Sequence, residues 1–160
     1  MTRSLDQAIL DLEERARNDD PSVLASAAQL IATYPTESRV WTLRAYVLAR
    51  TGNLKEAIAD ISRAMQLSSP EPAHHFDRGR YKLKLGEYLS AIDDFSEGLA
   101  LCEHHADEYY RESLYFLRAE ALIAAGRKSE ALADLMYVHD DFQLWTTELR
   151  SKQELVARCR

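Results

Sequence analysis

The stretch TGNLKEAIADISRA, residues 51–64, decides the fold because the chain repeats its skeleton twice more. LGEYLSAIDDFSEG at residues 85–98 and AGRKSEALADLMYV at residues 125–138 share four features with it. Each has Gly at the second position, Ala at the seventh, Asp at the tenth and a large apolar residue at the eleventh. A packing pattern that recurs along one chain indicates a repeat architecture, in which each copy covers its neighbours.

Helical periodicity surrounds the glycine of each copy. Before Gly52, apolar residues recur at Trp41, Ala45 and Leu48, and a second apolar stripe begins at Ala57. Glycine readily adopts the left-handed backbone conformation that ends a helix. Each copy is therefore expected to be a helical hairpin that turns at its glycine.

The intervals between the glycines locate an insertion. Gly52 and Gly86 are 34 residues apart, whereas Gly86 and Gly126 are 40 apart. The six extra residues are expected to lengthen helices or their connection near residues 103–111.

Two sets of positions are expected to hold the hairpins together. Small residues let the two helices of one hairpin approach closely, and large apolar residues fill the space between hairpins. The small set is Ala45, Gly79 and Ala119, and the large set is Ile61, Phe95 and Leu135.

The whole chain reads as one domain of ordinary size. Phe142, Trp145, Leu149 and Val156 form one stripe of an expected final helix that caps the last repeat. The expected order is a divergent N-terminal hairpin at residues 4–35, repeats at 38–70, 72–103 and 112–139, and the capping helix at 141–158.

The composition of the chain limits which classes of partner and which cellular compartment are expected. A net charge of −6 argues against nucleic acid as the main partner, because phosphate binding needs a basic surface. No apolar stretch approaches the roughly 18 residues of a membrane helix, and the N-terminus does not resemble a signal peptide. Cys102 and Cys159 fit neither a metal site nor a disulfide framework. We expect a cytoplasmic protein that binds no membrane, nucleic acid, metal or cofactor.

The residues that invite a catalytic interpretation fit poorly. Residues 126–129, GRKS, lack the first glycine and the preceding strand of a phosphate-binding loop. The adjacent pairs at residues 74–75 and 104–105, both His-His, diverge by about 100° on a helix and so do not chelate together. Asp60, Asp94 and Asp134 recur once per hairpin, which marks a structural or solvated position. An enzyme is therefore not expected.

The period and the residue pattern resemble those of the tetratricopeptide repeat (TPR) family. The matching positions are Trp41, Ala45, Ala57, Ile61, Ala64 and Pro70 in the first clear unit, His75, Gly79, Ala91, Phe95 and Gly98 in the second, and Tyr115, Ala119, Ala131 and Leu135 in the third. Val138 departs from the small residue of the pattern. The resemblance implies an all-α superhelix of helical hairpins with a concave surface that binds proteins or peptides.

The resemblance also implies which side chains face the concave surface. Applied to this sequence, the inward stripe selects Arg39, Thr42, Tyr46 and Arg50, then Ala73, Phe76, Arg80 and Lys84, then Ser113, Phe116, Glu120 and Ala124. The stripe is more basic than the acidic chain, which suggests a partner with carboxylates and an apolar anchor. Thr42 and Tyr46 stand where chaperone-binding relatives carry the Lys and the first Asn of a carboxylate clamp.

Three functions stay open from the sequence. The first is a protein-binding adaptor or dedicated chaperone-like protein, and the second is a scaffold that self-associates into a homo-oligomer. An enzyme is the third and least favoured. The insertion also offers a second contact surface, since Tyr109 and Tyr110 are of the residue type favoured at interfaces.

Overall fold

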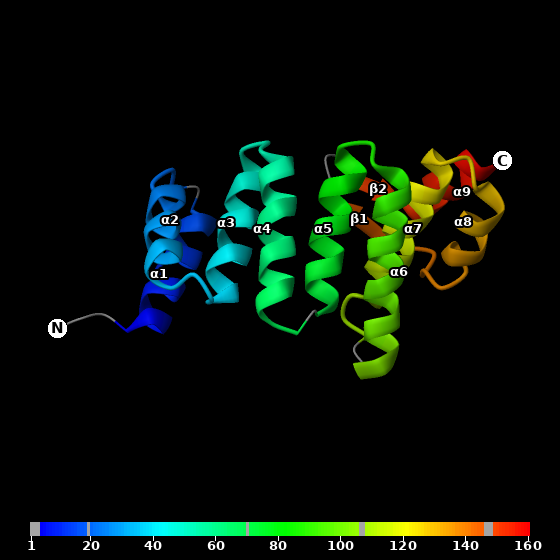
Figure 1. Ribbon diagram of the computed structural model, residues 1–160. Coiled ribbons are helices and arrows are strands. Elements are labelled where there is room, and N and C mark those ends of the chain that lie inside the picture. Colours follow the sequence, from blue (N-terminus) through cyan, green and yellow to red (C-terminus); the bar gives the residue numbers. More distant parts are fainter. Residues whose placement is uncertain (1–3, 19, 70, 106–107, 146–148) are drawn as a thin grey trace. The chain divides into compact units, whose positions relative to one another are not determined.

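The chain folds into an all-α helical repeat, as the repeated skeleton predicts (Figure 1). The computed structural model describes residues 4–18, 20–69, 71–105, 108–145 and 149–160. It divides into two compact units, the N-terminal unit at residues 1–70 and the C-terminal unit at residues 71–160. Pro70, the proline matched to the end of the first clear repeat, lies outside the described residues.

The N-terminal unit pairs two helical hairpins around one apolar cluster. Ile9, Val23 and Val40 are almost fully buried in this cluster, and each comes from a different helix. Packing therefore joins the divergent first hairpin to the clear repeat that follows it. The helices are α1 (Leu5–Arg17), α2 (Val23–Thr33), α3 (Ser38–Arg50) and α4 (Leu54–Leu67).

The C-terminal unit holds the other two clear hairpins and the end of the chain. Its hairpin helices are α5 (Pro72–Lys84), α6 (Tyr88–His105), α7 (Arg111–Ala124) and α8 (Lys128–Leu135). The insertion lengthens α6 to 18 residues, against 14 in the equivalent α4, as expected. Within the described part of residues 38–138 there is no strand, which agrees with the helical reading.

The three predicted turn glycines are confirmed. Gly52, Gly86 and Gly126 have φ angles of 85°, 78° and 80°, in the left-handed region that favours glycine. Each lies two residues beyond the last residue of its helix. The residue after each glycine donates its backbone N–H back to a carbonyl of that helix, as Asn53 does to Leu48 at 2.8 Å. The last turn of the helix is thereby satisfied before the chain reverses.

The expected packing positions are also confirmed. Ile61, Phe95 and Leu135 are each at most 1% exposed, and Ala45, Gly79 and Ala119 are buried. A Cβ atom added to Gly79 would lie 2.5 Å from the ring of Phe95. The small residue is therefore required by the close approach of α5 to α6 within one hairpin.

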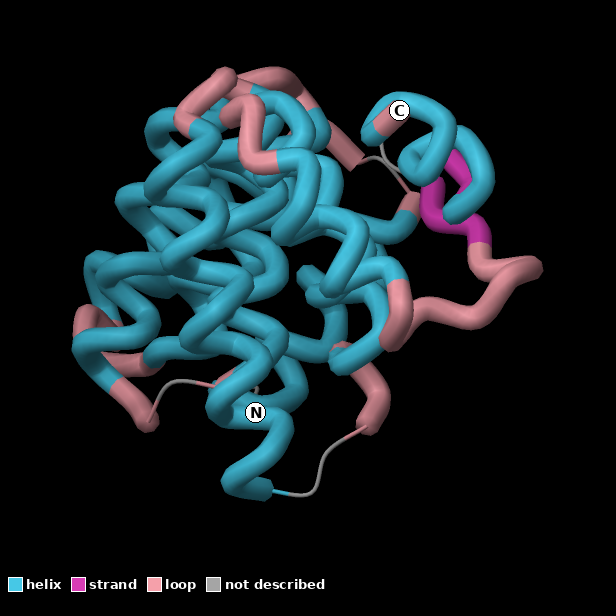
Figure 2. Tube along the Cα trace, turned by 90° about the vertical axis from the view of Figure 1, so that its right-hand side faces the viewer, coloured by secondary structure: helices cyan, strands magenta, loops and turns pink. Residues whose placement is uncertain are grey.

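The end of the chain differs from the predicted helix at residues 141–158. Instead, β1 (Gln143–Trp145) pairs antiparallel with β2 (Leu149–Ser151), and α9 follows at Lys152–Cys159. Figure 2 shows the two strands in magenta, leading into the final helix beside the C-terminal label.

A start signal for α9 explains why the helix begins late. Ser151 and Glu154 form a capping box, in which the Glu154 carboxylate accepts the Ser151 N–H at 2.7 Å. The expected apolar stripe changes as a result: Leu155 and Cys159 are buried and Val156 is partly buried, whereas Leu149 is 49% exposed. Trp145 lies in β1, and its side chain is outside the described part of the structure.

Candidate functional site

The recurring aspartates form structural ion pairs. Asp60, Asp94 and Asp134 are buried, and each receives two nitrogens of an arginine 16 residues earlier in the same hairpin. The arginines are Arg44, Arg78 and Arg118, and the shortest N–O distances are 2.6, 2.6 and 2.7 Å. These bonds account for the repeated Asp without assigning it a role in acid/base chemistry.

Asp94 has the richest surroundings of the three aspartates. Besides Arg78, it lies 2.8 Å from Lys82 Nζ and 3.5 Å from His75 Nδ1. Burial by itself would raise the pKa of Asp94, but the neighbouring His75, Arg78 and Lys82 outweigh it and hold the pKa well below its usual range. The carboxylate therefore stays ionised at neutral pH and binds the helices of its hairpin together.

In the N-terminal unit, the expected contact residues lie along α3, and the two nearest its start are already bound by neighbouring groups. Arg39 is engaged by Glu37 and Asp6, each at 2.8 Å, and these hydrogen bonds raise the pKa of its guanidinium. Thr42 donates its hydroxyl to the Ser38 carbonyl at 3.3 Å. Both side chains are therefore held by neighbours within the unit.

Tyr46 and Arg50 form a preformed pair one turn further along α3. Arg50 Nη1 donates to the Tyr46 hydroxyl at 2.8 Å, and the guanidinium lies 5.5 Å from the centre of the tyrosine ring. Arg50 is exposed, and Tyr46 is half-buried against the apolar cluster of the unit. An aromatic surface beside an oriented cation suits a ligand that offers both apolar and anionic groups.

The C-terminal unit places a similar pair on α5. The Arg80 guanidinium lies 5.2 Å from the centre of the Phe76 ring and 3.0 Å from the Asp77 carboxylate. Lys84 follows on the next turn and is exposed. Burial lowers the pKa of Lys84, and the like charge of Arg80 lowers it further. Two cations at this spacing repel each other, so an anion bound between them is favoured.

The aromatic residues of the insertion reach the same part of α5. Tyr110 lies 5.3 Å from Phe76 between ring centres, and Tyr109 lies 4.9 Å from Tyr110. Tyr109 is 82% exposed, while Phe76 and Tyr110 are half-buried. The two surfaces that the sequence offers as alternatives are therefore continuous within the C-terminal unit. We call Phe76, Arg80, Lys84, Tyr109 and Tyr110 the α5 surface.

On α7, the expected contact residues Phe116 and Glu120 are covered by the chain itself, whereas Ala124 is exposed. Phe116 is fully buried and lies 5.3 Å from the ring of Phe142. Glu120 is 8% exposed, and its carboxylate lies 3.1 Å from Arg150 of β2 and 3.9 Å from Arg158 of α9. The C-terminal segment therefore occupies the part of α7 at which the sequence places partner contacts.

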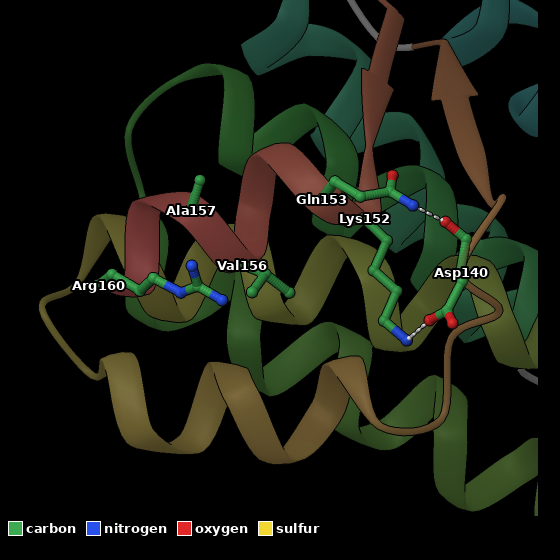
Figure 3. Close-up of a pocket in the computed structure, with 6 residues that line it drawn as sticks. All are labelled: Asp140, Lys152, Gln153, Val156, Ala157 and Arg160. Carbon is green, nitrogen blue, oxygen red and sulfur yellow. Dashed lines mark hydrogen bonds and ion pairs between the residues drawn. The ribbon is translucent and has the colours of Figure 1, made fainter.

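A hollow of about 430 Å³ lies beside α9, and Lys152 and Gln153 in its lining both bind Asp140. Lys152 Nζ lies 2.7 Å from the Asp140 carboxylate and 2.7 Å from the Val138 carbonyl. Gln153 donates to the backbone carbonyl of Asp140. Figure 3 shows Lys152 and Gln153 both pointing toward Asp140. This arrangement fastens the start of the C-terminal segment to α9.

Two kinds of site are not found in the part of the chain that the structure describes. Its His, Cys, Asp and Glu side chains include no group of three or more placed to hold a metal ion. Among its helices, none combines the length and the apolar character that spanning a bilayer requires.

Comparison with known proteins agrees with this geometry. A sequence model of the tetratricopeptide repeat family matches residues 38–70, while no curated protein has a significantly similar sequence. Several solved structures share the fold at low sequence identity. MamA has a TM-score of 0.71 at 12% identity, with 86% of this chain and 74% of that one covered.

Two further structures bind peptides or proteins according to their descriptions. YrrB, "a TPR protein with an unusual peptide-binding site", has a TM-score of 0.72 at 14% identity, covering 84% of this chain and 66% of that one. The TPR2B domain of yeast Sti1, in complex with pHsp70, has a TM-score of 0.68 at 20% identity, covering 72% and 94%. The present chain therefore has the fold of these tetratricopeptide repeat proteins, and the family model recognises a repeat in its sequence at residues 38–70.

Phe142 packs on the last repeat, as the sequence predicts, through its contact with Phe116. Sequence reasoning missed the two cations beside it, Arg150 and Arg158, which pair with Glu120. The available signal was the Ser151–Glu154 capping box, which starts α9 at Lys152 and leaves the preceding residues free to form a hairpin.

Proposed function

We propose that the chain is a protein-interaction module that binds a peptide or protein segment on the α5 surface. The observation that carries the proposal is the arrangement around Phe76, which has the Arg80 guanidinium at 5.2 Å and the Tyr110 ring at 5.3 Å. An aromatic anchor point beside oriented cations is the composition typical of peptide-binding surfaces. The TPR fold supports the same reading, since YrrB and the Sti1 domain are described with peptide or protein ligands.

The charges favour an acidic segment. Arg80 and Lys84 supply two cations, and Asp77 neutralises part of the field of Arg80. Burial raises the pKa of Asp77, while Arg80 opposes that rise. A ligand carboxylate placed between Arg80 and Lys84 relieves their mutual repulsion and gains charge-assisted hydrogen bonds. An apolar ligand residue then packs on Phe76 and the two tyrosines.

The biological role that follows is an adaptor or dedicated chaperone-like protein in the cytoplasm. Tyr46 and Arg50 of the N-terminal unit offer the same chemistry and are proposed as further contacts, with Arg39 and Thr42 beside them. Phe116 and Glu120 are covered by the C-terminal segment and are not part of the proposed α5 surface.

A peptide-display selection on the purified full chain tests this proposal. Selected peptides are expected to combine an acidic residue with an aromatic or large aliphatic residue. Arg80→Glu is expected to weaken their binding ten- to hundredfold, about 1.4 kcal/mol per decade. Arg63→Glu, which makes the same charge change at an exposed position of α4, is the matched control.

Self-association is the second candidate, and one observation favours it. Leu132 of α8 is 41% exposed, and Met136 and Tyr137, which follow the end of this helix, are 83% and 61% exposed. Exposed apolar groups at neighbouring positions are typical of an interface. Light scattering over a range of protein concentrations distinguishes the two candidates. The average molar mass rises with concentration for a self-associating scaffold and stays constant for a monomeric binder. Met136→Glu should abolish that rise if α8 forms the interface.

A further inference from the structure

The C-terminal hairpin lies on α7 in the way a bound ligand would. Phe142 packs on Phe116 with its ring tilted by 52° and centred 5.3 Å away. Arg150 lies 3.1 Å from the Glu120 carboxylate. One aromatic contact and one ion pair thus join the segment to the α7 positions at which the sequence places partner contacts. We call Phe116 and Glu120 the α7 face.

The hairpin and α9 are fastened to the unit by different contacts. α9 is anchored by Leu155, which is fully buried, and by Cys159, which is 9% exposed. The strands of the hairpin are three residues each, and Leu149 of β2 is 49% exposed. A two-stranded hairpin of this size has little stability of its own. Removing Phe142 and Arg150 from α7 breaks the hydrogen bond from the Lys152 N–H to the Phe142 carbonyl, but leaves Leu155 and Cys159 of α9 in place.

The charges on the α7 face decide what can replace the hairpin. Glu120 is 8% exposed, and a buried carboxylate without a cation is costly. When Arg150 leaves, Arg158 of α9 stays near Glu120, at 3.9 Å in the closed arrangement. The pairing of Glu120 with Arg158 reduces the free-energy cost of removing the hairpin from α7. Full compensation of the Glu120 charge requires a new cation at the place of Arg150.

We propose that the β1–β2 hairpin is an internal occupant of the α7 face, and that a partner segment pairing an aromatic side chain with a cation binds there by displacing it. This partner has the opposite charge preference to the segment expected on the α5 surface. The two sites are therefore separate, and the inference does not depend on the proposed function.

The test uses the full chain and a hairpin peptide as probe. The peptide joins the sequences of residues 142–145 and 149–152 through D-Pro-Gly, giving FQLW-pG-LRSK, because a two-residue turn suits the pairing of Trp145 with Leu149. A control peptide carries Glu in place of its Arg. Binding of both is measured by calorimetry to the wild type, to Arg150→Glu, and to the charge swap Glu120→Arg/Arg150→Glu.

Opening of the internal hairpin should control binding of the probe. In Arg150→Glu two carboxylates face each other, so the hairpin leaves and the Arg peptide binds at least tenfold more tightly than to the wild type. The charge swap restores attraction, closes the hairpin and returns binding to the wild-type level. The control peptide binds none of the three tightly.

Two binding results, or an unfolded variant, would overturn the inference. One is equal affinity of the Arg peptide for the wild type and Arg150→Glu, and the other is equal affinity of Arg150→Glu for the two peptides. Arg150→Gln, which removes the cation without adding repulsion, is measured in parallel and judged by the same criteria. Circular dichroism establishes that each variant is folded, and an unfolded Arg150→Gln would itself show that the hairpin is structural and not displaceable.

Discussion

Arg78 of α5 binds Asp94 of α6 with two nitrogens, Nη2 at 2.6 Å from Oδ1 and Nε at 3.0 Å from Oδ2. The same pair recurs at Arg44–Asp60 and Arg118–Asp134, always 16 residues apart. Each pair joins the two helices of one hairpin across a largely buried contact. The repeated skeleton thus includes a polar connection as well as its apolar positions.

Asp94→Asn should therefore destabilise the protein. The change removes the charge that compensates Arg78, Lys82 and His75, and breaking a buried pair costs about 3–5 kcal/mol. Because asparagine still accepts hydrogen bonds, we expect about 3 kcal/mol, measured by chemical denaturation. Asp93→Asn, on the exposed side of the same helix, is the control and should have almost no effect.

The contribution of Asp94 should also depend on pH. Its pKa is lowered in the folded state, so its stabilisation is fully present above the ordinary Asp value near 3.8 and is lost as pH falls toward the folded pKa. The difference in unfolding free energy between wild type and Asp94→Asn should be constant above about pH 5 and shrink below about pH 4. A difference that grows on acidification would contradict the assigned sign.

Gly79→Ala should be more damaging than Gly98→Ala. The added Cβ at Gly79 would lie 2.5 Å from the buried ring of Phe95, which has no room to move away. At Gly98 the nearest atom is a methyl of Leu114 at 3.1 Å, which needs only a small shift. We expect about 1–3 kcal/mol for Gly79→Ala, measured by thermal and chemical unfolding. The reverse order would mean that α5 and α6 do not approach here.

The end of the chain should depend on Leu155 and not on Leu149. Leu155→Ala leaves a cavity under α9 and should lower the free energy of unfolding by about 2–5 kcal/mol, whereas Leu149→Ala removes a half-exposed side chain and should lower it little.

Deletion of residues 141–160 should lower the melting temperature and the solubility, because it uncovers Phe116. Unchanged melting of the truncated chain would show that the segment does not cap the unit.

The repeated sequence pattern predicts much of this structure. Gly52 and the two equivalent glycines predict where the hairpins turn. Phe95 and the two equivalent large apolar residues predict the buried packing positions. Both predictions succeed because every repeat needs a turn glycine and a large buried residue. The repeat predicts a structural or solvated position for Asp94 without naming its partner, which lies 16 residues away. The available signal is that Arg recurs at positions 44, 78 and 118, directly before the small residue of each repeat.

Non-repeating parts of the chain escaped prediction for a physical reason. Whether Tyr110 contacts Phe76, and whether Phe142 and Arg150 cover α7, depends on contacts between segments distant in sequence. Periodicity carries no information about such contacts. The apolar stripe at residues 141–158 predicts one helix over this whole range. The capping box at Ser151 instead starts the helix at Lys152, and the burial of Leu155 fixes which face of that helix packs on the unit.

The proposed binding of a peptide on the α5 surface depends on Arg80 and Phe76. Its most direct measurement is the affinity of one selected acidic-aromatic peptide for the wild type, Arg80→Glu, Phe76→Ala and the control Arg63→Glu, each shown to be folded. We predict a loss of ten- to hundredfold for the first two variants, unchanged affinity for the control, and weaker binding at raised salt. Full affinity in both Arg80→Glu and Phe76→Ala would contradict the claim and move the binding site elsewhere on the chain.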